Sequence, residues 1–321
     1  MVKNIAVLTA GGDAPGMNAA IRAVVRASIY NHLRVFGVKR GFRGLIDGDI
    51  LEMDLPSVSG IINRGGTILK TIRCPEFKDK ENQRQAVSHL KSFAIDALIV
   101  IGGNGSLAGG GVLYYRWGIP VINIPASIDN DLCFTDYTVG FDTAVNTALE
   151  AIDKIRDTAT SHDRVFVVEV MGRDNGFIAL EVALGSGAEA VIVPEIKTNM
   201  DKLCENLVQG EHRGKKSSII IVAEGAAKGH DIAEIVTEKC GLEVRVSVLG
   251  YMQRGGTPTA FSRALAARMG KAAVDLLRAG KFGKMIGNQG TDIIATDIKK
   301  VLACKKKIDP SDYKLVSILS I

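Results

Sequence analysis

Aromatic side chains are scarce in this sequence, and their scarcity narrows the classes of ligand that the chain is suited to bind. Phe, Trp and Tyr make up 5% of the 321 residues, and the 40 Lys and Arg residues exceed the 35 acidic residues by only five. Binding of single-stranded nucleic acid combines a basic groove with stacking aromatics, and no stretch of this sequence interleaves the two. We therefore expect no nucleic-acid partner, and the mild, scattered positive charge suits small anionic ligands better.

The sequence also lacks paired cysteines and long apolar runs. None of its five cysteines lies in a C-x-x-C pair, and their number is odd, which argues against a disulfide framework and against a zinc site. Such cysteine usage favours a reducing, cytoplasmic compartment. No stretch approaches the roughly 18 uninterrupted apolar residues of a membrane-spanning helix, so we expect no membrane partner. The three consecutive lysines at 305–307 are interpreted as solvated surface.

Glycine, in contrast, is abundant, with 35 residues, and short apolar runs alternate with segments of helical period. The runs Ala97–Ile101, Val165–Val170 and Ser218–Ala223 are continuously apolar or nearly so, as expected for strands buried on both faces of a parallel sheet. Segments such as Pro15–Tyr30 have the spacing of amphipathic helices. The alternation predicts an α/β fold with largely parallel sheets, and the length predicts about two domains.

Glycine-rich loops follow two of the predicted strands. Gly11 and Gly12 come just before a predicted helix whose free N–H groups would suit a phosphate. The segment Gly103–Ala108 formally fits a dinucleotide fingerprint, but the acidic residue that should end the next strand comes late, at Asp129. Because ligands of open α/β sheets bind beyond the carboxyl ends of the strands, both loops are candidate phosphate sites.

Carboxylates and arginines follow other predicted strands. Asp129 and Asp131 are two residues apart after a strand, so in extended chain both side chains point the same way. One can act as a base while the other assists a metal ion. Arginine suits bidentate contact with phosphate, and single arginines follow strands or open turns at Arg73, Arg173, Arg245 and Arg254. These residues favour a phosphoryl-transfer enzyme over a dehydrogenase but leave both classes open.

Three separated motifs give the chain a specific resemblance over nearly its whole length. GGDAPGMN at 11–18, PASIDND at 125–131 and MGR at 171–173 together resemble the family of bacterial ATP-dependent 6-phosphofructokinases, the type A phosphofructokinases. The resemblance implies two three-layer α/β domains with largely parallel sheets. It implies an ATP-binding domain over 1–138 and 252–304, and a fructose 6-phosphate-binding domain over 139–251 and 305–321. It also implies a glycolytic kinase that uses Mg²⁺ and assembles as a homotetramer.

The resemblance further implies residue roles for phosphoryl transfer from ATP to the 1-hydroxyl of fructose 6-phosphate. Asp129 is implied as the base, with Arg173, Arg73, Ser127 and the backbone of Gly12 stabilising the transferring group. The residues implied around ATP are Gly12, Phe42, Arg73, Cys74, Phe77, Gly103, Asn104, Gly105 and Ser106. Those implied around the sugar phosphate are Ser127, Ile128, Asp129, Arg164, Met171, Gly172, Arg173, Glu224, Arg245, Tyr251 and Arg254. In the family some of these arginines reach in from a neighbouring subunit.

Two further sites follow from the resemblance. An effector site for ADP or phosphoenolpyruvate is implied at Arg22, Arg26, Arg156, Gly187, Glu189, Arg213 and Lys215. A magnesium site is implied at Asn104 and Asp131.

Several positions depart from the family pattern. The family usually has a magnesium-binding Asp where this chain has Asn104, and a neutral amide is a weaker ligand for a hard cation than a carboxylate. Ala126, Tyr251 and Leu55 also replace the usual family residues. These departures leave two alternatives to an ATP-dependent kinase. Under these alternatives the chain is either a non-catalytic or weakly active regulatory paralogue, or an enzyme that uses pyrophosphate as donor. The pyrophosphate-dependent relatives usually carry Asp at the position of Gly105, so Gly105 favours ATP.

Overall fold

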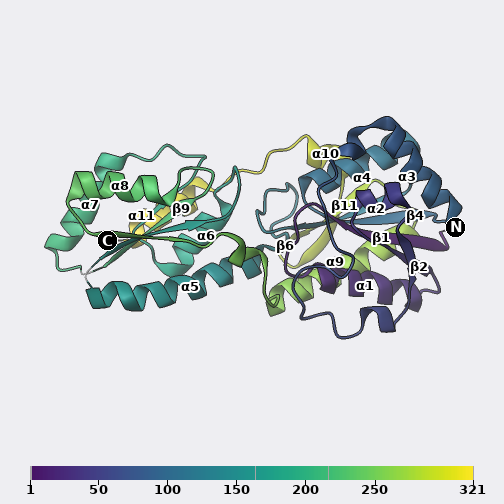
Figure 1. The fold of residues 1–321 in the computed structure, drawn as a ribbon, viewed down its shortest axis with the longest axis horizontal. Helices are drawn as coiled ribbons and strands as arrows, with labels where there is room; N and C mark the ends of the chain where they lie inside the picture. Colours follow the sequence, from purple (N-terminus) through teal and green to yellow (C-terminus); the bar gives the residue numbers. More distant parts are fainter. Residues whose placement is uncertain (1, 163, 216, 321) are drawn as a thin grey trace. The chain divides into compact units, whose positions relative to one another are not determined.

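The chain forms two units, which are described one at a time (Figure 1). The computed structural model describes residues 2–162, 164–215 and 217–320. The first unit comprises Met1–Asp142 and Arg254–Lys306, and the second comprises Thr143–Gln253 and Lys307–Ile321. The divisions thus fall at 142, 253 and 306, where the sequence predicts 138, 251 and 304. The chain passes from one unit to the other three times.

A mostly parallel sheet forms the centre of the first unit, with its strands in the order β12-β11-β5-β4-β1-β2-β3 and β6 paired to β5. The strands are β1 (Asn4–Ala10), β2 (Arg34–Val38), β3 (Ile50–Met53), β4 (Ala97–Gly102), β5 (Val121–Ser127), β6 (Val139–Gly140), β11 (Lys284–Gln289) and β12 (Asp292–Asp297). The pairs β2–β3 and β11–β12 at the two edges are antiparallel, whereas the inner pairs are parallel. Since every residue of β4 is buried, its continuously apolar sequence fits the middle of a parallel sheet.

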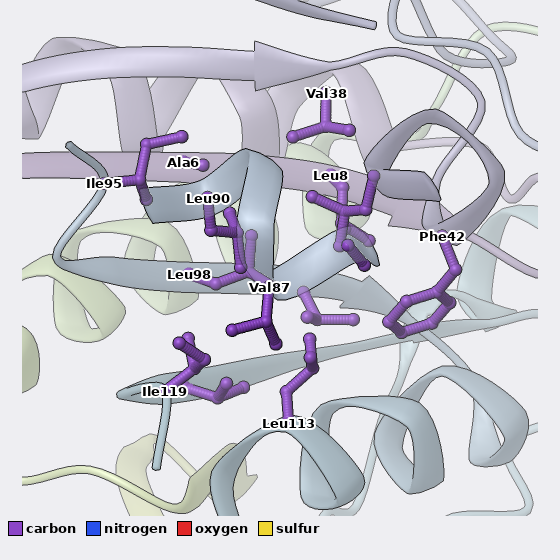
Figure 2. Packing of buried hydrophobic residues seen from close by; sticks show 14 of the residues in the cluster. Ala6, Leu8, Val38, Phe42, Val87, Leu90, Ile95, Leu98, Leu113 and Ile119 are labelled. Carbon is purple, nitrogen blue, oxygen red and sulfur yellow. The ribbon is translucent and has the colours of Figure 1, made fainter. Parts of the chain in front are cut away.

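Helices cover both faces of this sheet. They are α1 (Met17–Tyr30), α2 (Phe42–Asp47), α3 (Lys80–Ser92), α4 (Asn104–Trp117), α9 (Ala260–Arg278) and α10 (Ile298–Leu302). Helices α1 and α9 pack side by side on one face, whereas α2, α3 and α4 lie on the other. On the second of these faces, Leu8 and Leu98 of the sheet meet Val87 and Leu90 of α3 and Leu113 of α4 (Figure 2). The unit therefore has three layers.

The second unit repeats this plan around a smaller, fully parallel sheet in the order β10-β7-β9-β8. Its elements are α5 (Phe141–His162), β7 (Val165–Val170), α6 (Phe177–Ser186), β8 (Ala190–Ile192), α7 (Met200–His212), β9 (Ser218–Ala223), α8 (Gly229–Cys240), β10 (Val244–Val248) and α11 (Pro310–Leu319). Val167 and Val222 of the sheet pack with Leu207 of α7 and Val236 of α8. The predicted α/β fold with largely parallel sheets is thereby confirmed.

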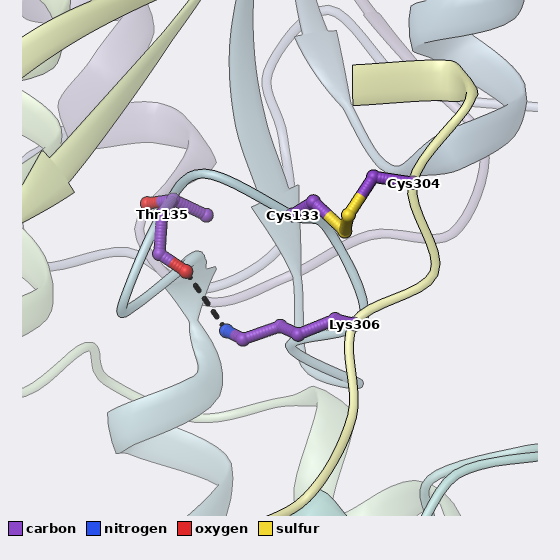
Figure 3. Close-up of a disulfide and its surroundings, with 4 residues drawn as sticks. All are labelled: Cys133, Thr135, Cys304 and Lys306. Atoms are coloured by element: carbon purple, nitrogen blue, oxygen red, sulfur yellow. Dashed lines mark hydrogen bonds between the residues drawn. A yellow bond between two sulfur atoms is a disulfide. The ribbon is translucent and has the colours of Figure 1, made fainter. Parts of the chain in front are cut away.

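Two expectations from the sequence are wrong. Cys133 and Cys304 form a disulfide with their Cα atoms 6.0 Å apart (Figure 3), although the cysteine pattern argues against a disulfide framework. The partners are 171 residues apart, so no local spacing reveals them. Lys306 is also not a solvated surface lysine, because it is partly buried and its Nζ donates to the carbonyl oxygens of Thr135 and Asp136 at 2.8 and 3.1 Å.

Helices of the described ranges are all too short or too polar to cross a membrane.

Candidate active site

The loops after β1 and β4 are locked together, as expected for neighbouring parallel strands. The buried Ser106 hydroxyl, at the start of α4, donates to the Ala10 carbonyl at 2.9 Å. A side chain at Gly102 would overlap that carbonyl and Ser106, so the close approach requires glycine there. Helix α1 begins at Met17, later than the predicted Pro15, because Gly16 has a left-handed φ of 110°. Gly103, Asn104 and Gly105 lie at the amino end of α4, where the first backbone N–H groups of a helix lack intrahelical acceptors and suit an anion.

An arginine lies directly over the first glycine loop. A Cβ at Gly12 would overlap the guanidinium of Arg254, whose side chain is only 14% exposed. Arg254 Nη1 is 4.0 Å from Asp13 Oδ1. The first unit thus brings together Gly12 and Arg254, and their arrangement presents positive charge and backbone donors at the carboxyl end of β1. Such a combination suits a phosphate oxygen.

The loop after β5 holds Asp129 in a fixed position. Asp129 is 2% exposed, its backbone N–H donates to Ser127 Oγ at 3.2 Å, and Ser127 Oγ is 3.4 Å from Asp129 Oδ2. Asn130, with a φ of 51°, spans the loop by accepting from the Thr138 N–H at 3.0 Å and donating to the Asp136 carbonyl at 2.9 Å. These contacts make the loop over 128–138 a braced structure, so the carboxylate of Asp129 is preorganised.

The amide of Asn104 links α4 to the loop over 128–138. Its Nδ2 donates to Asp131 Oδ2 at 2.7 Å, so the two residues with implied magnesium roles are adjacent. Asn104 is exposed and Asp131 is half-buried. Carboxylate and amide oxygens are the protein ligands that suit hard cations, and with the amide nitrogen on Asp131 the second carboxylate oxygen stays available. The donor set therefore fits Mg²⁺ that is held mainly by Asp131 and substrate phosphates.

Three of the residues implied around ATP, namely Phe42, Cys74 and Phe77, pack in the hydrophobic core of the first unit or against it. Phe42 and Phe77 are buried and stacked on each other, with ring centroids 4.4 Å apart. Cys74 packs against the same cluster, and burial raises the pKa of its thiol. Arg73 is exposed beside it, and the nearby Thr71 hydroxyl donates to the Gly11 carbonyl at 2.9 Å. This bond fixes the segment that carries Arg73 to the first glycine loop.

In the second unit, Glu224 shapes the turn that carries Arg173. Glu224 Oε1, just after β9, accepts from the backbone N–H groups of Gly172 and Arg173 at 3.1 and 2.8 Å. These residues follow β7 and have φ values of 148° and 51°. The Met171 N–H donates to Gln253 Oε1 at 2.8 Å. The structure thus brings Met171, Gly172, Arg173 and Glu224 together at the carboxyl ends of β7 and β9.

Two of the implied sugar-phosphate residues lie at the amino ends of the strands of this sheet, opposite the carboxyl ends that carry Arg173. Arg164 precedes β7 and Arg245 is near the start of β10, and both pair with Glu243, at 3.0 and 2.5 Å. A strand of six residues spans about 17–20 Å, so Arg164 and Arg245 do not share one phosphate with Arg173 of the same chain. Tyr251 follows β10 and is 81% exposed.

The implied effector residues fall into two groups. Arg22 and Arg26 lie on α1 of the first unit. In the second unit, Lys215 Nζ pairs with Glu189 Oε1 at 2.9 Å, and Arg156 Nη2 donates to the Ser186 carbonyl at 2.7 Å, beside Gly187. A cavity of about 800 Å³ here is lined by residues that include Glu189, Lys202, Arg213, Lys215, Tyr313 and Ser317.

Sequence reasoning missed the residues that brace the loops. Gln253 is fully buried and accepts a hydrogen bond from the backbone of Met171. A hydrogen bond between Thr138 and Asn130 closes the loop after β5. Lys306 donates to two carbonyl groups of that loop. The partners of Gln253 and Lys306 lie far away in the sequence. Asn130 lies in the PASIDND motif, but its partners Asp136 and Thr138 lie beyond that motif, so no spacing signal marks these contacts.

The chain is similar to known proteins over most of its length. A family model described as phosphofructokinase matches residues 4–277. The chain is 52% identical to the ATP-dependent 6-phosphofructokinase of Halalkalibacterium halodurans and 51% identical to that of Alkaliphilus metalliredigens, over 100% of each chain.

Among solved structures, a phosphofructokinase from Saccharomyces cerevisiae is similar with a TM-score of 0.91 and 36% identity, over 94% of this chain and 45% of the yeast chain. The chain therefore spans less than half of that relative. A pyrophosphate-dependent phosphofructokinase from Marinobacter aquaeolei has a TM-score of 0.83 at 24% identity, over 96% of this chain and 86% of that one, which is a likeness of fold alone.

Proposed function

Since this chain belongs to the phosphofructokinase family, we propose that it transfers the γ-phosphoryl group of ATP to the 1-hydroxyl of fructose 6-phosphate. The observation that carries the proposal is the full-length identity of 52% to an ATP-dependent 6-phosphofructokinase. The products are fructose 1,6-bisphosphate and ADP, so the chain is a kinase of glycolysis.

In this proposal Asp129 is the catalytic base. As the hydroxyl oxygen bonds to the γ-phosphorus and the bond to the ADP oxygen breaks, the hydroxyl proton passes to the Asp129 carboxylate. The burial of Asp129 and its bracing by Ser127 support the role, because phosphoryl transfer depends mainly on positioning and on neutralising charge. Arg173, Arg73, Ser127 and the Gly12 backbone then stabilise the charge of the transferring group.

ATP is the proposed donor because the start of α4 is open. Apart from its chain neighbours and the backbone of its own helix, no heavy atom of the described residues lies within 4 Å of a Cβ built at Gly105. The rest of a nucleotide can therefore extend past this position, where an acidic side chain would repel it. Phe42, Cys74 and Phe77 are proposed to line the nucleotide site, and Gly103 to Ser106 its phosphates.

Magnesium is proposed to be held by Asp131, with Asn104 orienting that carboxylate through its amide. The 2.7 Å hydrogen bond between them supports this division of roles. The cation would neutralise charge on the donor phosphates. At position 104 the family's usual metal-binding Asp is thus replaced by Asn104, which in this proposal positions the carboxylate of Asp131.

We also propose a homotetramer in the cytoplasm with an effector site. The placement of Arg164 and Arg245 at the strand ends opposite Arg173 supports sugar-phosphate sites shared between subunits. The cavity beside Arg213 and Lys215 supports a site for an anionic effector such as ADP or phosphoenolpyruvate. The free thiols of Cys74, Cys204 and Cys240 support the cytoplasmic location, whereas the bridge between Cys133 and Cys304 is unusual for that compartment.

The test is ADP release by the purified protein with fructose 6-phosphate and ATP over a series of Mg²⁺ concentrations. We expect turnover that requires both substrates. Formation of fructose 1,6-bisphosphate with pyrophosphate alone would overturn the choice of donor. Sugar-phosphate binding without turnover from either donor would assign the chain to a regulatory subunit.

A further inference from the structure

The disulfide between Cys133 and Cys304 joins two segments that bear on the proposed site. Cys133 lies in the loop over 128–138, four residues after Asp129 and two after Asp131. Cys304 follows α10, three residues before the chain passes into the second unit at Lys307. The bridge therefore joins the loop that carries the proposed base to the segment that leads from the first unit into the second (Figure 3).

The same loop has anchors that do not depend on the bridge. Leu132 is 1% exposed and packs with Ile298 and Val301 of α10, and Lys306 Nζ donates to the Thr135 and Asp136 carbonyls. Because these contacts remain when the bridge opens, its loss would loosen the loop without unfolding the first unit, whose main core lies around Leu8 and Leu98.

The two bridged residues differ in exposure. Cys133 is 5% exposed, whereas Cys304, which follows the end of α10, is an exposed residue. A thiolate attacks a disulfide at an accessible sulfur, so Cys304 is the point of attack and Cys133 is the leaving thiolate. Bridges placed on exposed segments are the labile ones.

We propose that the Cys133–Cys304 bridge controls the mobility of the loop over 128–138 according to its redox state. The oxidised bridge holds the loop in place, and reduction of the bridge by a dithiol loosens the loop. The effect on turnover rests on the proposed kinase function. One thiolate of the dithiol bonds to Cys304 Sγ as the protein S–S bond breaks, and Cys133 leaves and takes up a proton. The second thiol then displaces Cys304, which is also protonated. The protein gains two electrons and two protons, and the dithiol becomes its own disulfide.

Loosening acts first on Asp131 because it is two residues from the bridge. Its position relative to Asn104 is set by one hydrogen bond of 2.7 Å, so added motion weakens the proposed magnesium site. Loss of a group that orients a metal ligand costs about tenfold or more in metal affinity, and we expect the half-saturating Mg²⁺ concentration to rise about tenfold on reduction.

The experiment compares the full-length protein after air oxidation and after treatment with dithiothreitol. Alkylation followed by mass spectrometry should count three free thiols in the first form and five in the second. Hydrogen exchange without magnesium should be faster in the reduced form at the amides of 129–138 than at those of β1 and β4. Reoxidation should restore both the exchange rates and the magnesium requirement.

Two variants sharpen the comparison. Cys304→Ser should behave like the reduced form under both conditions. The control is Cys240→Ser, which removes a thiol of the second unit and should leave the response to dithiothreitol unchanged.

Three results would overturn the proposal: five free thiols after oxidation, identical exchange at 129–138 in both forms, or an equal increase in exchange at 129–138 and in the core strands. The last result would make the bridge a general stabiliser. Absence of ADP release in both forms would instead contradict the kinase function, and the exchange comparison would still decide whether the bridge controls the loop.

Discussion

At the scale of single residues, the buried carboxylate of Asp129 is the most direct test of the chemistry. Asp129→Asn keeps the shape of the side chain and removes its ability to take a proton. General base catalysis is typically worth about 10²–10⁴ in rate, so we expect kcat to fall by that factor. Binding of fructose 6-phosphate, measured by calorimetry, should change little, and retained turnover would remove Asp129 from the role of base.

Asn104 offers a second test at this scale. Asn104→Asp supplies a second carboxylate where the amide now donates to Asp131 at 2.7 Å. With magnesium the two carboxylates can bind the cation together, so the half-saturating Mg²⁺ concentration should fall. Without magnesium they repel each other, so the melting temperature in a chelating buffer should also fall. A magnesium series that matches the unchanged protein would contradict the assignment.

At the scale of elements, Lys306 couples the segment after α10 to the loop over 128–138. Burial lowers the pKa of its ammonium group to about 8, although the nearby carboxylates of Asp136 and Asp131 oppose this change. The lysine of an unfolded chain titrates near 10.4, so between about pH 8 and 10 the unfolded state binds more protons than the folded state. The contribution of Lys306 therefore makes the free energy of unfolding rise with pH across this window.

The matched variant Lys306→Met isolates this contribution. We expect the free energy of unfolding, measured with urea in metal-free buffer, to rise less between pH 8 and pH 10 in the variant than in the unchanged protein. The two pH profiles would be parallel if Lys306 stayed fully protonated throughout.

The inner strands could be predicted from the sequence because their apolar runs are continuous. The predicted Val165–Val170 and Ser218–Ala223 are β7 and β9, and Ala97–Ile101 lacks only the last residue of β4. The hairpin of β11 and β12 was not predictable in this way, since β12 is partly exposed throughout and β11 contains Asn288 and Gln289. Edge strands carry polar side chains and an antiparallel partner, so the apolar-run pattern does not find them.

The candidate site shows the same division between local and distant signals. The glycine loops and the pair Asp129 and Asp131 are visible in the sequence because each motif is local. The bond between Asn104 and Asp131 and the bridge between Cys133 and Cys304 join positions 27 and 171 residues apart. Such contacts are decided by which strands are neighbours in the sheet, and a single sequence does not specify that order.

At the scale of the whole molecule, Arg245 and Arg173 lie at opposite ends of two neighbouring strands, β10 and β7, and this separation leads to a prediction for mixed oligomers. An Asp129→Asn protomer lacks the base, and an Arg245→Ala protomer lacks a proposed contact to the sugar phosphate of its neighbour. Each variant alone should be nearly inactive. Oligomers of the proposed tetrameric form, reassembled from a mixture, should regain activity, because some sites then combine an intact base with an intact arginine.

The readout is turnover before and after dissociation and reassembly of the mixed variants. Each variant carried through the same treatment alone is the control. A mixture with no more activity than the sum of its parts would show that each chain completes its own site.

The pairing of β5 with β11 has a consequence for synthesis on the ribosome. β5 ends at Ser127 and its neighbour β11 begins at Lys284, so one edge of β5 has no β11 to pair with while more than a hundred further residues are being added. During that interval all four strands of the second sheet, from Val165 to Val248, are completed. The nascent chain thus contains every strand of the second sheet before β11 is available to pair with β5 in the first sheet. Unpaired strand edges are where nascent and newly released chains associate wrongly, so we expect chains halted between β5 and β11 to aggregate more readily than the finished protein.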